Sequence, residues 1–242
     1  MRKFASLLGL AALLSAQAAQ AQMDPSNPSC PTSLNVSNYR EMRFTPQEVD
    51  GRRVLLAEGY IDDGTAERLQ AALDANPEIN EIWFRSPGGD AREGNEAGRI
   101  IRDNGMITRI PQGWTCFSAC NFMFMGGMAR FVDPGGIFMV HMFTHTQDRD
   151  AIRGSVARGE DSTIGLIAEV EQSSALLATQ DNDFLIRMGV SRDLLTNVMY
   201  QVPSVANAQS RETRRCLSQQ EVLRYNVATE IIEQDRPGGN AK

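Results

Sequence analysis

The chain contains two histidines, His141 and His145, so any imidazole chemistry must use one of them. His141 stands in the apolar run 137–143, which predicts a buried strand. A histidine in such a strand is more often a hydrogen-bonded structural residue than a base. His141 falls toward the carboxyl end of the run, however, and sites in α/β folds form at that end of their strands. It is therefore a candidate general base.

Ser118 is the candidate nucleophile that could work with such a base. It stands at the predicted start of an apolar helix over 118–125, within the segment 115–120. A serine there can simply cap the helix. Alternatively, the positive end of the helix stabilises an alkoxide, and the Ala119 amide serves as an oxyanion donor. The G-x-S-x-G elbow of lipases is not present around Ser118.

Gly88 and Gly89 lie between a predicted strand and a predicted helix. Most Pro-Gly-Gly segments are only turns. Glycines nevertheless allow a backbone to approach a ligand closely, and amides at a helix start can hold a developing oxyanion. The Gly89 amide is therefore a candidate second donor.

Four cysteines follow the first 21 residues, and four thiols allow three disulfide pairings. We favour Cys116 with Cys120 and Cys30 with Cys216, because the first two are close in any fold. This pairing requires Cys116 to precede the helix, since an i, i+4 pair within a helix bridges poorly. Free buried thiols are the alternative.

The same region offers a zinc alternative. Cys116, Cys120, His141 and His145 form a Cys₂His₂ set with 20 residues between its two halves. A zinc finger of the usual kind has about 12 residues there, and the intervening residues 122–127 resemble the core of a larger domain. We predict no metal and no other cofactor.

The first 21 residues have the pattern of a secretory signal peptide. Arg2 and Lys3 precede an apolar run over 4–14, and alanines occupy positions 19 and 21. The run is too short to span a bilayer, and no later stretch is long enough. No cysteine follows the cleavage site, which argues against a lipid anchor. We predict an exported, periplasmic protein without a transmembrane segment.

Composition is that of a globular protein. Of 242 residues, 42% are hydrophobic, and 24 Lys and Arg stand against 30 Asp and Glu. These values argue against long disorder. A net charge of −6, without a basic run, makes nucleic acid an improbable partner.

The candidate residues need a scaffold, and strand patterns alternate with helix patterns. Short connections between them are typical of a largely parallel α/β sheet. Predicted strands cover 54–61, 81–85, 106–110 and 137–143, and predicted helices begin near residues 65, 90 and 118. In the second helix, Asp90 and Glu93 have capping-box spacing.

The remaining segments are less regular. Residues 22–47 read as an irregular lead-in, and 237–242 as a loose tail. After a polar stretch over 147–161, apolar residues at helical spacing predict a long helix. Ser218 and Glu221 again have capping-box spacing at the start of a last helix.

Taken in order, these pieces resemble the ClpP/crotonase superfamily, and specifically exported relatives of the Clp protease subunit. The resemblance runs from Val54 to Val227 and rests on six segments: Gly59 with Asp62-Asp63, Ser86-Pro87-Gly88-Gly89, Ser118-Ala119, Arg130-Phe131, Val140-His141, and Leu217-Ser218 through Val227. It implies an α/β spiral of ββα units with a protruding handle helix, in one domain over 48–236. It also implies a homo-oligomer that acts on peptides or proteins.

The resemblance further implies that Ser118 is the nucleophile, His141 the base, and Gly89 and Ala119 the oxyanion donors. One departure concerns the third catalytic residue, because Arg214 stands where the family has an aspartate. Glu212 is the carboxylate nearest in sequence, and we predict it for that role. Asp181 and Asp183, in the handle region, are the other candidates.

The function predicted from these features is a periplasmic serine hydrolase, specifically a ClpP-like peptidase. A catalytically inactive binding or assembly module on the same fold is the alternative, because the acid is missing from its usual position. An acyl-CoA-processing enzyme of crotonase type is a weaker one, since export separates it from cytoplasmic CoA.

Overall fold

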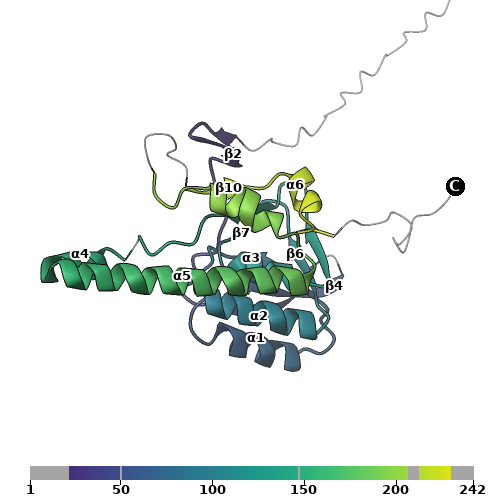
Figure 1. Ribbon diagram of the computed structural model, residues 1–242. Coiled ribbons are helices and arrows are strands. Elements are labelled where there is room, and N and C mark those ends of the chain that lie inside the picture. Colours follow the sequence, from purple (N-terminus) through teal and green to yellow (C-terminus); the bar gives the residue numbers. More distant parts are fainter. Residues whose placement is uncertain (1–21, 50, 147, 207–212, 230–242) are drawn as a thin grey trace, which may run out of the picture.

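The main sheet of the protein has five strands and is largely parallel. The structure is a computed structural model that describes residues 22–49, 51–146, 148–206 and 213–229 (Figure 1). Strands β4, β5, β6 and β8 run parallel, and β3 pairs with β4 in the antiparallel sense. In sheet order the strands are β3 (Arg43–Val49), β4 (Arg52–Glu58), β5 (Glu81–Arg85), β6 (Ile107–Ile110) and β8 (Ala129–Val132).

A smaller three-stranded sheet adjoins the first. Its order is β10 (Arg215–Cys216), β9 (Ile137–Val140) and β7 (Thr115–Phe117), with β7 and β9 parallel. A bridge between Ser86 and Cys116 connects it to the end of β5. Near the N-terminus, β1 (Met23–Asp24) and β2 (Asn27–Pro31) form a short hairpin. The two sheets are therefore joined at the carboxyl end of β5, which lies beside β7.

Helices cover the sheets, and one of them extends beyond the body. They are α1 (Thr65–Asp74), α2 (Ala91–Asp103), α3 (Cys120–Met125), α4 (Arg149–Arg158), α5 (Glu160–Met188), a π-helical turn (Leu194–Val198), a 3₁₀ turn (Met199–Gln201) and α6 (Gln219–Arg224). The buried residues of α5 all lie near its C-terminal end, from Asp181 onward. Its N-terminal part projects from the molecule with α4 beside it (Figure 1).

Helices α2 and α3 pack with their backbones almost in contact. A Cβ at Gly98 would lie 2.5 Å from the Phe122 carbonyl oxygen, and one at Gly126 would lie 2.2 Å from the Gly98 carbonyl oxygen. Any larger side chain at either position would force the helices apart. The start of α3 is thereby fixed against the helix that follows Gly89.

Several predicted elements occur where the sequence places them, and others differ. Strands β4, β5 and β6 and helices α1 and α2 match their predicted segments to within a few residues. The lead-in over 22–47 was expected to be irregular, but it contains β1, β2 and most of β3. Strand β3 is largely exposed at the sheet edge, so it lacks the apolar alternation that identifies a strand.

Other differences concern short or polar elements. Helix α4 lies within the predicted polar stretch 147–161, and strand β9 ends at Val140 rather than at residue 143. The Asp90 side chain caps α2. The Glu93 carboxylate does not complete a capping box but accepts a hydrogen bond from the Ala66 amide at 2.9 Å. At α6 both halves of the predicted box between Ser218 and Glu221 are present. The signal peptide and the tail over 237–242 lie outside the described residues.

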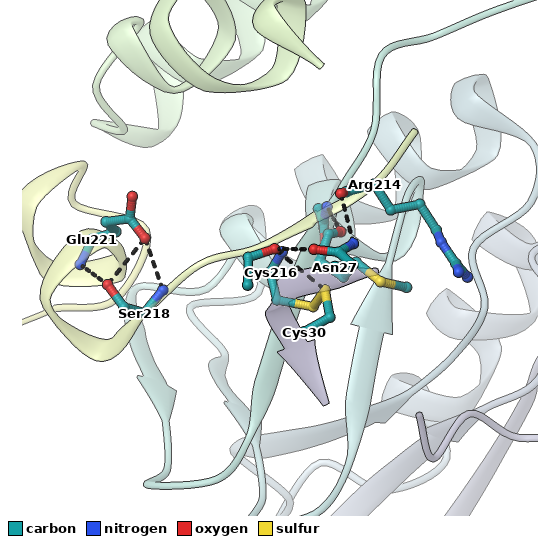
Figure 2. Close-up of a disulfide and its surroundings, with 9 residues drawn as sticks. Asn27, Cys30, Arg214, Cys216, Ser218 and Glu221 are labelled. Carbon is teal, nitrogen blue, oxygen red and sulfur yellow. Dashed lines mark hydrogen bonds between the residues drawn. A yellow bond between two sulfur atoms is a disulfide. The ribbon is translucent and has the colours of Figure 1, made fainter. Parts of the chain in front are cut away.

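Two disulfides agree with the pairing that the sequence favoured. Cys30 on β2 is bonded to Cys216 on β10, with Cα atoms 5.1 Å apart (Figure 2). Close to it, the Asn27 side-chain amide donates to the Arg214 carbonyl oxygen at 3.0 Å. Cys116 is bonded to Cys120, with Cα atoms 5.4 Å apart. None of the helices in the described part of the chain is long and apolar enough to cross a membrane.

Candidate active site

Ser118 and His141 contact each other directly. The Ser118 Oγ lies 2.6 Å from the His141 Nε2, although 23 residues separate them in sequence. The parallel pairing of β7 with β9 explains this, because its register sets Phe117 opposite Met139. The residues that follow these two strands therefore emerge at the same edge of the small sheet.

Ser118 lies on a turn and not in the helix that the sequence predicts over 118–125. Helix α3 begins at Cys120, and Ser118 has φ +60°, in the left-handed region that non-glycine residues rarely adopt. Ala119 is the N-cap of α3, and no side chain caps that helix. The hydroxyl of Ser118 is therefore turned toward His141 instead of serving as a cap.

Hydrogen bonds on both sides hold this turn. The Ser118 amide donates to the Met139 carbonyl oxygen at 3.4 Å, and the Asn121 side chain donates to the same oxygen at 2.7 Å. The Asn121 amide donates to the Ser118 carbonyl oxygen at 2.9 Å. The disulfide between Cys116 and Cys120 closes the turn at its base. Together these contacts offset the cost of a strained backbone at Ser118.

The environment of His141 favours its neutral form. Burial lowers the pKa of the ring below its ordinary value, and a backbone hydrogen bond at Met142 partly opposes that shift. The ring of Phe117 lies against the imidazole, with centroids 4.9 Å apart. A neutral imidazole can accept a proton from the Ser118 hydroxyl.

The Gly88-Gly89 segment passes directly beside Ser118. Gly88 has φ +86°, and a Cβ there would lie 2.6 Å from the Ser118 Cβ and 3.0 Å from the Ala119 nitrogen. Ile61 bonds to the residues flanking Gly89, donating to the Gly88 carbonyl and accepting from the Asp90 amide. This pairing turns the Gly89 amide away from Ile61. Among the described residues neither this amide nor that of Ala119 has a hydrogen-bond acceptor.

These groups border a single cavity of about 320 Å³. It contains both free amides, the Ser118–His141 contact and one buried carboxyl group, that of Asp181. The lining includes Gly89, Ser118, Ala119, Phe122, His141, Phe143, Leu177, Asp181 and Met199. Four of the residues predicted from the sequence, Ser118, His141, Gly89 and Ala119, thus meet in one place.

The predicted acid is not part of what the structure describes, because Glu212 lies outside the described residues. Arg214, which stands where the sequence resemblance leads one to expect an aspartate, is exposed. Asp183 is exposed on α5, whereas Asp181 lines the cavity and is 5% exposed. Over residues 22–49, 51–146, 148–206 and 213–229, no carboxylate is hydrogen-bonded to His141.

Sequence reasoning missed two neighbours of Asp181. The Asn95 side-chain amide donates to the Asp181 carboxylate at 3.3 Å. The Tyr200 hydroxyl is buried, and burial together with the Asp181 charge raises its pKa. Asn95 lies on an otherwise regular amphipathic helix, and Tyr200 lies in a short turn without a motif, so nothing local in the sequence singles them out.

The zinc alternative conflicts with the bonding of the sulfur atoms. Cys116 and Cys120 are bonded to each other, which removes the thiolates that zinc would need. His145 contacts the Ser173 hydroxyl at 3.2 Å, on the exposed side of α5. Within the described residues, no cluster of three or more His, Cys, Asp or Glu side chains has a metal-binding arrangement.

Comparisons with known proteins add a limited likeness. A scan against protein-family models gives no match, and a search of curated proteins gives none either. Among solved structures, the chain is similar to a mutant of ClpP1 from Listeria monocytogenes, with 15% sequence identity and a TM-score of 0.45. The similarity covers 72% of this chain and 88% of the other. A likeness of this size does not decide the activity, and the site geometry must support any functional conclusion.

Proposed function

We propose that the protein is a serine hydrolase, specifically a peptidase, in which Ser118 is the nucleophile and His141 the general base. One observation carries the proposal: the Ser118 hydroxyl lies 2.6 Å from the His141 Nε2, beside two amides that have no acceptor among the described residues. A nucleophile in contact with a base, next to oxyanion donors, is the arrangement required for acyl transfer.

In the proposed reaction, the Ser118 Oγ attacks the carbonyl carbon of a peptide bond while His141 takes the hydroxyl proton. The amides of Gly89 and Ala119 stabilise the oxyanion of the tetrahedral intermediate. His141 then gives the proton to the leaving nitrogen as the C–N bond breaks, which leaves an acyl ester on Ser118. Water, deprotonated by His141, hydrolyses the ester and restores the serine.

The chain has an internal control for this assignment. Ser173 on α5 and His145 in the segment before α4 form a second serine–histidine contact, 3.2 Å long, at an exposed position. This pair has the same two functional groups as Ser118 and His141, a hydroxyl and an imidazole. Ser173, however, lies inside a continuous helix whose backbone amides are hydrogen-bonded within the helix. A contact of this kind has no oxyanion donors, and we expect it to be unreactive.

A fluorophosphonate probe tests the proposal on the purified protein without its first 21 residues. Labelling is expected at Ser118, and the Ser118→Ala and His141→Ala variants should lose it. The matched variants Ser173→Ala and His145→Ala should keep it. Absence of labelling from about pH 6 to about 9 contradicts the proposal and favours an inactive binding module. That alternative fits the observation that no carboxylate among the described residues accepts a hydrogen bond from His141.

Glu212 remains the proposed orienting acid. Loss of such a carboxylate costs about 10⁴ in rate in a serine protease. A Glu212→Gln variant should therefore label on the order of 10⁴ times more slowly, while Asp183→Asn, on the exposed face of α5, should label at the normal rate. Equal rates in the two variants would remove Glu212 from the site.

We also propose export to the periplasm and self-association. Two disulfides fit an oxidising compartment, as does the signal-like pattern of residues 1–21. Mass spectrometry of the protein recovered from the periplasm tests export, since removal of residues 1–21 fixes the new N-terminus. Light scattering of the purified protein tests self-association.

A further inference from the structure

The cavity beside Ser118 has an apolar wall and a polar end. Phe122, Phe143, Leu177 and Met199 contribute the apolar side chains. Leu177 and Asp181 are four residues apart on α5 and therefore lie on the same face of that helix. The Asp181 carboxyl therefore lies next to the apolar wall and forms the polar end of the cavity.

Asp181 has no cationic partner in the part of the chain that the structure describes. It is 5% exposed, and its one hydrogen bond among the described residues is the 3.3 Å contact from the Asn95 amide. No arginine or histidine of the described chain forms a salt bridge with it. Burial raises the pKa of this carboxyl to about 6, and the Asn95 amide opposes the shift. A buried carboxylate without a counter-charge is costly unless a bound group supplies one.

Two further polar atoms near Asp181 are without partners. The Asn95 Oδ1 and the Tyr200 hydroxyl are both buried and form no hydrogen bond among the described residues. Buried polar atoms of this kind usually have a partner, so each calls for an explanation. Of these three groups, the Asp181 carboxyl is the one that borders the cavity. An occupant with a positive charge and N–H donors would satisfy it.

We propose that this cavity binds the side chain of a lysine or arginine in the substrate, with Asp181 as the specificity-determining residue. The apolar wall would cover the methylene stem, and the ammonium or guanidinium group would reach the Asp181 carboxylate. The inference rests on the proposed function, because it places the substrate residue next to the bond that Ser118 attacks.

Two phosphonate probes that differ in one group test this preference. Diphenyl phosphonates bearing a lysine or a norleucine side chain have similar length, but only the first is charged. The lysine probe should label Ser118 about 100 times faster, the effect of pairing a buried charge. In Asp181→Asn the ratio of the two rates should fall to near one, whereas Asp183→Asn should keep the full ratio.

The ratio also separates this role from that of a catalytic acid. If Asp181 acted through His141, the Asn variant would slow both probes by the same factor and leave the ratio unchanged. That outcome overturns the proposal, and so does an equal or faster rate with the norleucine probe in the unmodified protein.

A binding measurement tests the cavity without any reaction at Ser118. Butylguanidinium is titrated into the Ser118→Ala protein and followed by amide NMR shifts. Shifts at Ala119 and Asp181 are expected, and they should be absent in Ser118→Ala with Asp181→Asn. Absence of binding in Ser118→Ala itself overturns the proposal. Binding that depends on Asp181, in a protein whose Ser118 resists fluorophosphonate, would refute the hydrolase while supporting the cation site.

Discussion

The two disulfides hold two different regions of the molecule. Cys116 and Cys120 are four residues apart and close the turn that carries Ser118, while Cys30 and Cys216 are 186 residues apart and fasten β2 to β10 (Figure 2). A long loop loses much more chain entropy in the unfolded state than a short one when it is cross-linked. The comparison indicates that the long-range disulfide mainly stabilises the fold, whereas the local one mainly fixes the conformation of the site.

Removal of the long-range disulfide should have the largest effect. In a variant with Cys30→Ala and Cys216→Ala, the free energy of unfolding should fall by about 5 kcal/mol, the chain-entropy value for a loop of that length. Urea denaturation measures the change. Probe labelling of the protein that remains folded should be normal, and a specific loss of labelling would contradict the division between the two regions.

Removal of the local disulfide should reverse that pattern. With Cys116→Ala and Cys120→Ala, the unfolding free energy should fall by only about 2 kcal/mol because the loop is short. Labelling at Ser118 should slow on the order of 100-fold, since a displaced oxyanion donor costs about 3 kcal/mol.

The outcome that would contradict this prediction is full labelling in the local variant. It would mean that the hydrogen bonds from Ser118 and Asn121 to Met139 hold the turn without the disulfide. Treating the unmodified protein with reductant provides a control in the same sample.

The two regions should also differ in their response to pH. Labelling requires the neutral form of His141, and burial lowers the pKa of its ring. The labelling rate should therefore rise about tenfold per pH unit in acid and level off at a pH below 6.5, the ordinary pKa of histidine. Glu221 lies beside the other disulfide. Burial acts to raise the pKa of its carboxyl, but its hydrogen bonds with Ser218 and the nearby Arg215 together lower it below the ordinary value. Its stabilising contribution is present above its ordinary pKa of 4.5 and is lost as the pH falls.

These two titrations can be measured separately. The rate of probe labelling against pH reports His141, and urea denaturation at pH 3 to about 5 includes the Glu221 contribution. A midpoint for labelling above pH 6.5 would contradict the buried, neutral imidazole.

The smallest expected effect is at the cap of α6, next to Cys216. The Ser218 hydroxyl accepts from the Glu221 amide at 3.3 Å, and Ser218→Ala should lower the free energy of unfolding by about 1 kcal/mol. Gln220→Ala, on the exposed surface of the same helix, is the matched control. Labelling should be normal in both, and a slower rate in Ser218→Ala alone would connect this region to the site.

Local patterns predict the part of the fold in which one face of an element is buried. Strands β4, β5 and β6 are rich in apolar residues, and α2 combines an Asp90 cap with regular amphipathic spacing. Strand β3 and helix α4 are mostly exposed, so neither has an apolar pattern that would predict it from the sequence. Strand β3 forms because it pairs with β4, and helix α4 because it packs against α5. Sequence patterns also place Ser118 inside a helix, because the apolar run begins there.

By itself, the sequence determined which groups are available for chemistry: Ser118 at the start of an apolar helix, two histidines, a pair of glycines and an even number of cysteines. Only the tertiary structure decided that Ser118 and His141 touch and that Asp181, rather than Asp183, faces the same cavity. The physical reason is that these contacts depend on the register of β7 against β9 and on the packing of α5. Both are set by interactions between residues far apart in the chain, which local spacing does not encode.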